Sequence, residues 1–233
     1  NRDYFEIFGF SIGPAEDSEM RRRLEKGFDT FYDVRAMSDR DIALFAKQNK
    51  IDIAIDLTGY TLNGRPGIFA HRAAAIQINY LGYPGTMGAA FIDYIIADKY
   101  LIPKESQHFY SEKVIYMPHH YQAQNDTVQV LKMMPTREEL GLPLEKFVFC
   151  SINNSYKITR SEFDIWMRLL LCIEGSVLWL VEVNRWAKEN LLKEANARGV
   201  SSERLIFAKR TSHSKYLAQF KEADLYLDTF IYN

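Results

Sequence analysis

The feature that most constrains this chain is an alternation of short strand-like runs with segments of helical spacing. Runs rich in branched and aromatic residues occupy positions 4–10, 51–57, 76–81, 94–97, 114–117, 147–150, 177–181, 205–207 and 225–227. Segments with helical periodicity lie between several of these runs, at positions 40–48, 185–197 and 214–221. Strands connected through helices pair in parallel, so the sequence predicts an α/β fold built on doubly wound parallel sheets.

Residues 118–135 interrupt this alternation and divide the chain. The stretch is polar, aperiodic and bounded by prolines, which indicates a linker between domains. Residues 1–117 are then part of a first Rossmann-like domain, and residues 136–233 are part of a second. In the second part, Thr136 to Glu139 and Thr159 to Glu162 are capping-box patterns, and each predicts the start of a helix.

Composition and charge exclude several classes of protein. The 233 residues are 47% hydrophobic and 25% charged with a formal net charge of −1, which gives no long-range attraction to nucleic acid or to a membrane. No apolar run approaches the roughly 20 residues of a membrane span. Cys150 and Cys172 are predicted to be buried in a reducing compartment, and the histidines lack metal-ligand spacing. We therefore expect a cytoplasmic protein without a bound metal.

Two loops in the first half follow predicted strands and carry unusual residues. Residues 56–72 form either an ordinary connection with a surface arginine or a loop that places Thr61 and Arg65 in a ligand cleft. Residues 81–85 hold two glycines and a proline, which fits either a turn with positive φ or main-chain N–H groups that approach ligand oxygens. The spacing is not that of a dinucleotide-binding fingerprint.

A third candidate site follows the predicted strand that ends at Cys150. Small polar residues come next, and Lys157 then lies two positions before the threonine of the second capping box. A lysine beside a helix N-terminus combines a positive charge with free N–H groups, which favours an anion-binding site. The alternative is a solvated lysine in a loop.

These motifs resemble the catalytic region of the O-linked N-acetylglucosamine transferases, and most closely the bacterial SPINDLY-like members that carry TPR repeats. The matching motifs are GYT-x3-R-x3-FA-x-R, LGYPGT-x-GA-x3-DYIIAD, SEK-x3-MP and NN-x-YKI, in matching order. The resemblance implies a glycosyltransferase-B fold with two facing Rossmann-like domains, each only partly present here. It also implies a metal-independent enzyme that binds a nucleotide sugar mainly on the second domain and an acceptor protein through the first.

The resemblance assigns roles to individual residues. Lys157 matches a lysine that contacts the donor diphosphate and stabilises the departing nucleotide. Thr211 matches a position where main-chain groups hold the base, and Tyr216 replaces a histidine that stacks on it. The remaining matches are to residues beside the lysine or near the donor sugar: Asn154, Tyr156, Leu81, Gly82, Tyr83 and Pro84.

The implied reaction is inverting transfer of N-acetylglucosamine from UDP-N-acetylglucosamine to serine or threonine of acceptor proteins, with no cofactor. Tyr216 departs from the family pattern and leaves the base less certain, and SPINDLY-like relatives include GDP-fucose users, so a GDP-fucose-dependent protein O-fucosyltransferase stays open. A nucleotide-sugar epimerase and a non-catalytic protein-binding scaffold are two further alternatives. A homo-oligomer is also left open. The family's Asp-Phe-x-x-His-Pro and His-Thr-Thr runs are absent from the 233 residues, so we expect this stretch alone to be inactive.

Overall fold

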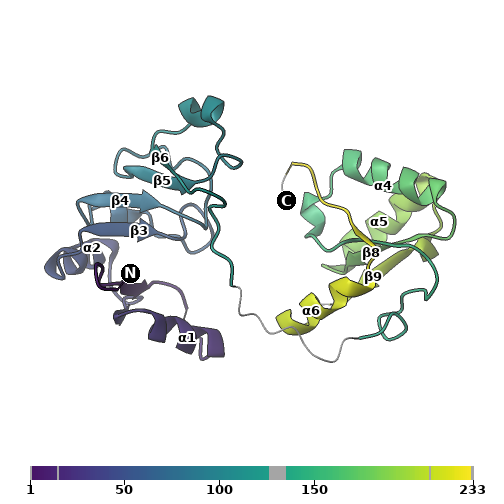
Figure 1. Cartoon of the computed structure of the whole chain (residues 1–233), viewed down its shortest axis with the longest axis horizontal. Helices are drawn as coiled ribbons and strands as arrows, with labels where there is room; N and C mark the ends of the chain where they lie inside the picture. The colour runs from purple at the N-terminus through teal and green to yellow at the C-terminus, as the bar shows by residue number, and fades with distance from the viewer. Residues whose placement is uncertain (1, 15, 126–134, 210, 232–233) are drawn as a thin grey trace. The chain divides into compact units, whose positions relative to one another are not determined.

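The computed structural model describes residues 2–14, 16–125, 135–209 and 211–231, and it divides into two units (Figure 1). Unit 1 comprises Asn1–Gln124 and unit 2 comprises Asn125–Asn233. The division lies within residues 118–135, the stretch expected to be a linker.

Unit 1 contains two parallel sheets, of two and four strands. In the smaller sheet, β1 (Phe8–Ser11) pairs with β2 (Thr30–Asp33), and α1 (Glu19–Gly27) connects the two strands. The larger has the order β3 (Ile53–Asp56), β4 (Ile76–Asn79), β5 (Tyr94–Ala97) and β6 (Lys113–Tyr116). The helix α2 (Asp39–Gln48) connects β2 to β3, and the connections within the larger sheet include α3 (Gly67–Ala70) and the 3-10 helix η1 (Lys104–Phe109).

The two faces of the larger sheet differ in what covers them. On one face, Ile42 of α2 and Phe69 of α3 pack into the core of unit 1. The opposite face carries branched side chains that remain accessible, with Ile53, Ile55 and Ile115 exposed to 44%, 47% and 38%. Unit 1 therefore has one well-buried and one partly bare sheet face.

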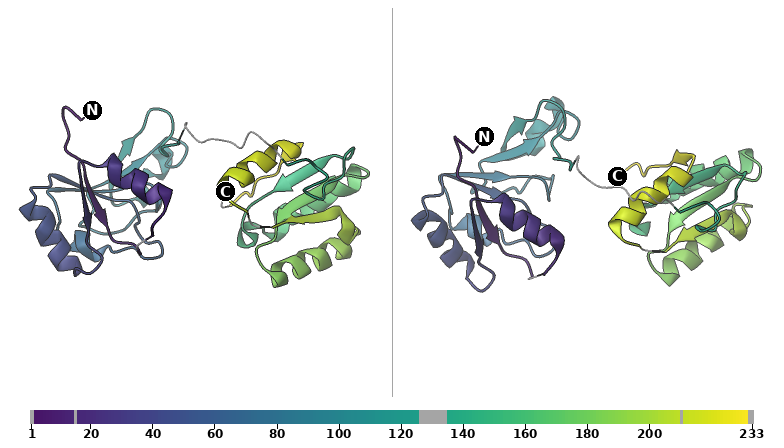
Figure 2. Two further views of the ribbon diagram at one scale, coloured as in Figure 1. Left: turned by 90° about the horizontal axis from the view of Figure 1, so that it is seen from below. Right: turned by 60° about the horizontal axis from the view of Figure 1, so that its bottom comes forward.

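Unit 2 is a three-layer arrangement around one parallel sheet (Figures 1 and 2). The strand order is β10 (Leu225–Tyr226), β7 (Val148–Ser151), β8 (Val177–Val181) and β9 (Leu205–Ala208). Helices α4 (Arg160–Cys172) and α5 (Arg185–Ala197) lie on one face, and α6 (His213–Gln219) lies on the other. Short 3-10 helices complete the unit: η2 (Ser155–Lys157), η3 (Ser202–Arg204) and η4 (Phe220–Glu222).

Alternation along the strands of unit 2 supplies both helix layers. Phe149 and Leu178 point to the α4/α5 side, where they pack with Phe163 of α4. Their neighbours Cys150 and Trp179 belong to a separate core on the side of α6. Strands that are apolar on both faces are typical of parallel sheets, so the predicted parallel α/β fold is confirmed.

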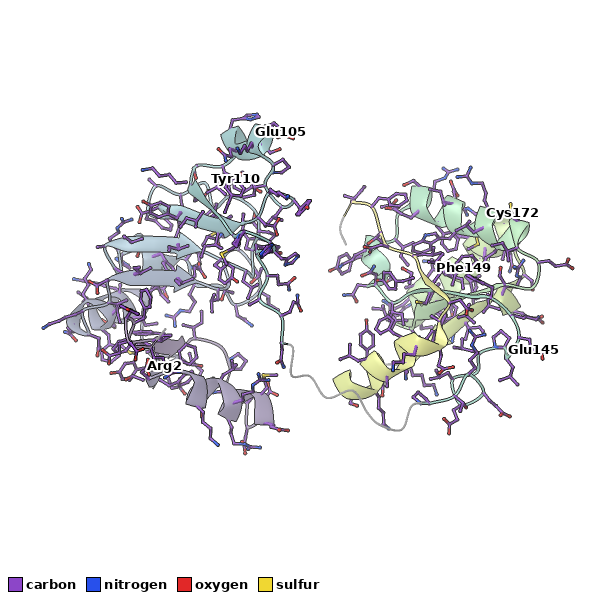
Figure 3. All side chains as sticks on the ribbon, viewed as in Figure 1. Arg2, Glu105, Tyr110, Glu145, Phe149 and Cys172 are labelled. Carbon is purple, nitrogen blue, oxygen red and sulfur yellow. The ribbon has the colours of Figure 1, made fainter. Side chains whose placement is uncertain are left out.

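Two sequence-based expectations were wrong. Thr136 and Glu139 make the reciprocal capping-box hydrogen bonds, at 2.9 and 3.3 Å, but only turns follow. Gly141 has φ of +69° and Pro143 comes two residues later, so the chain cannot continue as a helix. Cys172 is exposed, not buried, because this last residue of α4 lies off the helix face that contacts the sheet (Figure 3).

Candidate functional site

The strand order of unit 2 locates a crevice at one edge of the sheet. From β7 the chain proceeds through β8 to β9 on one side, and β10 then returns to the other side of β7. Open α/β sheets bind ligands beyond the carboxyl ends of the strands at such a reversal of order. The loops concerned are residues 152–157, after β7, and residues 227–231, after β10.

Asn153 connects these two loops. Its side-chain amide donates to the Tyr226 hydroxyl at 3.0 Å and to Asp228 Oδ1 at 3.3 Å. Both contacts reach from the end of β7 to the end of β10. The loop that carries Lys157 is therefore fixed against its neighbour before any ligand binds.

Lys157 lies in a hollow of about 420 Å³ next to these loops. Tyr156, Thr159 and Ile231 complete the lining. Lys157 is the last residue of η2 and is half-buried, whereas the Tyr156 ring is 72% exposed. The predicted catalytic lysine and its predicted neighbour Tyr156 thus share one open site.

The N-terminus of α4, just beyond Lys157, is already occupied by a carboxylate. Glu162 is fully buried, and it accepts hydrogen bonds from the Phe230 N–H at 3.0 Å and the Ser161 hydroxyl at 3.2 Å. Burial opposes ionisation of Glu162, but the hydrogen bonds from Phe230 and from the first turn of α4 outweigh it and lower its pKa. The attraction expected from the helix end is therefore reduced, and the anion site predicted from the sequence would depend mainly on the Lys157 ammonium.

A second pocket, of about 220 Å³, opens at the carboxyl ends of β7, β8 and β9. It brings together three residues that were assigned to nucleotide binding from the sequence: Asn154, Thr211 and Tyr216. The sequence interpretation missed the two other polar side chains of the lining, Lys209 and Gln219. Gln219 lies three positions after Tyr216 on α6, a spacing that places both on the same helix face.

Tyr216 supplies a fixed aromatic surface to this pocket. Its ring meets that of Phe220 edge-on, with centroids 4.8 Å apart, and its hydroxyl lies 3.5 Å from the Ile152 carbonyl. Burial raises the pKa of Tyr216 above its ordinary value, so the phenol stays neutral at physiological pH. A neutral ring held on one edge can stack on a planar base.

In unit 1, the predicted loop at residues 81–84 is shaped by contacts within the chain. The positive φ expected at a glycine occurs at Leu81, at +71°. A Cβ atom on Gly82 would lie 2.2 Å from the Leu57 carbonyl oxygen, so this glycine permits two backbones to meet. Tyr83 and Pro84 are half-buried behind it.

Thr61 and Arg65 have partners within unit 1. The Thr61 hydroxyl donates to the Thr58 carbonyl at 2.8 Å. The Arg65 guanidinium donates to Asp39 Oδ1 at 2.7 Å and to the Met37 carbonyl at 2.8 Å, which ties this loop to the start of α2. Their role in substrate binding stays a prediction.

The comparison with known families decides the assignment. The family described as glycosyl transferase family 41 matches residues 1–134 and 120–233. This chain belongs to that family. Its parallel α/β units are those of a glycosyltransferase of the B type, and a solved lysine-to-methionine mutant of the Thermobaculum terrenum O-GlcNAc transferase superposes with a TM-score of 0.87 at 25% identity. That match covers 100% of this chain and 44% of the solved one.

Two similar proteins carry names that specify a reaction. The Arabidopsis thaliana protein named probable UDP-N-acetylglucosamine–peptide N-acetylglucosaminyltransferase SEC is 35% identical over 238 residues, covering 100% of this chain and 24% of the relative. A SPINDLY protein of the same description from Eustoma exaltatum subsp. russellianum is 28% identical over 223 residues, covering 94% of this chain and 24% of the relative. This chain thus spans about a quarter of the length of these relatives.

Among the described residues, no group of three or more histidine, cysteine, aspartate or glutamate side chains could hold a metal ion. No helix in the described ranges is long and apolar enough to cross a membrane.

Proposed function

We propose that this chain belongs to a protein O-glycosyltransferase that transfers N-acetylglucosamine from UDP-N-acetylglucosamine to serine or threonine of acceptor proteins. The reaction inverts the anomeric configuration and needs no metal cofactor. The printed names of the SEC and SPINDLY relatives support both the donor and a peptide acceptor. Because the chain spans only part of those relatives, the activity is assigned to the full-length protein.

One observation carries the proposal. A single loop after β7 lines two hollows of unit 2, with Asn154 in the pocket of Tyr216 and Lys157 in the hollow of Tyr156 and Ile231. Tyr216 would stack on the nucleotide base, and the amides of Asn154 and Gln219 would hydrogen-bond its edge. The sequence separation of Asn154 and Lys157 suits a ligand with a base at one end and a diphosphate at the other.

The chemistry assigned to Lys157 follows from its charge. The acceptor hydroxyl attacks the anomeric carbon as the bond from that carbon to the diphosphate oxygen breaks. Negative charge then grows on the departing nucleoside diphosphate, and a nearby ammonium stabilises that charge more in the transition state than in the substrate. Lys157 acts through its charge alone, and a separate group must accept the hydroxyl proton.

Calorimetric titration of the full-length protein with UDP, GDP, UDP-N-acetylglucosamine and GDP-fucose tests the proposal. Selective binding of the uridine ligands is the expected result. Selective binding of the guanosine ligands would replace the donor with GDP-fucose, and binding of none would favour a protein-binding scaffold. Sugar release or conversion without an acceptor would favour an epimerase.

Transfer to a peptide should proceed at an unchanged rate after treatment with EDTA. A rate that falls with EDTA and returns with magnesium would contradict the metal-independent mechanism.

A further inference from the structure

Glu112 is a buried carboxylate whose hydrogen bonds all serve one loop. It lies directly before β6, and its side chain is 4% exposed. Its Oε2 accepts from the Thr86 hydroxyl at 2.7 Å, and its Oε1 accepts from the Met87 N–H at 2.7 Å. Burying a carboxylate costs free energy unless the carboxylate is well hydrogen-bonded. The hydrogen bonds of Glu112 to Thr86 and Met87 offset this cost and hold the loop in place.

Other side chains hold the same loop from the protein side. The Asn79 amide donates to the carbonyls of Tyr83 and Gly85, at 2.9 and 3.2 Å. The Tyr110 hydroxyl donates to the Pro84 carbonyl at 3.2 Å (Tyr110 is labelled in Figure 3). The three consecutive carbonyls of residues 83–85 therefore point toward the side chains that hold the loop.

The direction of these carbonyls determines the direction of the next amides. In a trans peptide the C=O and the following N–H point in opposite directions, and the described residues contain no cis bond. The N–H groups of Gly85 and Thr86 are therefore directed away from the anchoring side chains. Two neighbouring N–H groups held in this way are ready donors for the oxygens of a ligand.

We propose that Glu112 is a positioning residue that fixes residues 83–87 so that the amides of Gly85 and Thr86 can donate to oxygens of the sugar in a nucleotide-sugar donor. This inference rests on the proposed function. Glu112 does not touch the donor; it acts through Thr86 and Met87. Tyr60 is a further anchor at this end of the loop, since its hydroxyl donates to the Met87 carbonyl at 3.0 Å.

The test compares two ligands that differ only by the sugar. In the full-length protein, the affinities for UDP and for UDP-N-acetylglucosamine are measured for the wild type, Glu112→Ala and Glu112→Gln. We expect Glu112→Ala to bind the nucleotide sugar about tenfold more weakly, the loss for about one hydrogen bond, and to bind UDP normally. Glu112→Gln, which can still accept from Met87, should recover most of the loss.

Two further variants keep the test decisive. Thr86→Val removes the hydroxyl that contacts Glu112 and should reproduce the sugar-specific loss. This variant replaces Glu112→Ala in the test if Glu112→Ala does not fold. Asp93→Asn is the matched control, because Asp93 precedes the neighbouring strand β5 and accepts from Arg72 and from the Gln77 N–H, both at 2.8 Å, rather than from residues 83–87. It should leave the ratio of the two affinities unchanged.

The outcomes separate this inference from the proposed function. Normal affinity for both ligands in Glu112→Ala and Thr86→Val would overturn the inference alone, as would an equal loss for both ligands. A wild-type protein that binds neither ligand would overturn the proposed function, and the positioning role with it.

Discussion

At the scale of single residues, Lys157 is the side chain on which the proposed chemistry depends most. The adjacent helix end is already engaged by Glu162, whose oxygens accept from Phe230 and Ser161. The lysine charge therefore has little help from α4. We expect Lys157→Ala in the full-length protein to lose about 2–4 kcal/mol of transition-state stabilisation, which lowers kcat/KM about 30- to 1,000-fold.

Steady-state kinetics with a peptide acceptor would measure this loss. The matched control is Lys193→Ala, which removes a lysine that is exposed on α5. It should change kcat/KM less than twofold. Equal rates for Lys157→Ala and the control would remove Lys157 from the mechanism.

At the scale of elements, local patterns predicted what local physics determines. The periodicity of α5 gave its bounds, Arg185–Ala197, and the Thr159 box predicted the start of α4. The Thr136 box failed because Gly141 and Pro143, just beyond it, end the turn.

The same limit applies to the candidate site. Motifs located Asn154, Thr211 and Tyr216, but no local pattern reveals contacts between distant segments, such as that of Arg65 with Asp39 or of Glu162 with Phe230.

The loop after β4 allows a direct test of one such contact. Gly82→Ala would place a Cβ atom 2.2 Å from the Leu57 carbonyl oxygen, so one of the two loops must move. We expect a loss of about 1–3 kcal/mol in the free energy of unfolding. Gly13→Ala is the control, because a Cβ there has nothing within 4 Å, and it should leave stability unchanged or slightly raised. Urea denaturation with equal midpoints for the two variants would contradict the close approach.

Glu162 makes the junction of α4 with the loop after β10 dependent on pH. Its pKa is lowered in the folded state because the hydrogen bonds from Phe230 and the first turn of α4 outweigh burial. A lowered pKa stabilises the fold above the unfolded value, about 4.3 for glutamate, and this contribution is lost as pH falls through the folded value. We expect Glu162→Gln to be less stable than the wild type at pH 7, with the difference shrinking below about pH 4.

Urea unfolding at several pH values would measure that difference for Glu162→Gln and for a control, Glu145→Gln, which changes an exposed residue (labelled in Figure 3). The control should match the wild type throughout. A constant gap between Glu162→Gln and the wild type from pH 7 to pH 3 would show that the charge of Glu162 contributes nothing.

At the scale of the whole molecule, the bare face of the larger sheet in unit 1 has a measurable consequence. Parallel sheets are normally buried on both faces, yet Ile53, Ile55 and Ile115 are exposed to 44%, 47% and 38% on the same face. The buried polar residues of the sheet, among them Gln77 and Asn79, lie on the other face. The side that faces solvent is thus the more apolar one, which is the usual signature of a surface that associates.

We expect the 233-residue chain to bind a hydrophobic dye such as ANS and to self-associate as its concentration rises, because contact between two such faces removes apolar area from water. Ile55→Lys places a charge at the centre of the strand and should reduce both effects. Leu62→Lys is the matched control, since Leu62 is 89% exposed in the loop after β3 rather than on a strand of the sheet, and it should behave as the wild type does. Sedimentation velocity would measure association directly. If the wild type stays monomeric at every concentration and binds no dye, this face does not mediate association. If Leu62→Lys reduces self-association as much as Ile55→Lys does, the added charge alone is responsible.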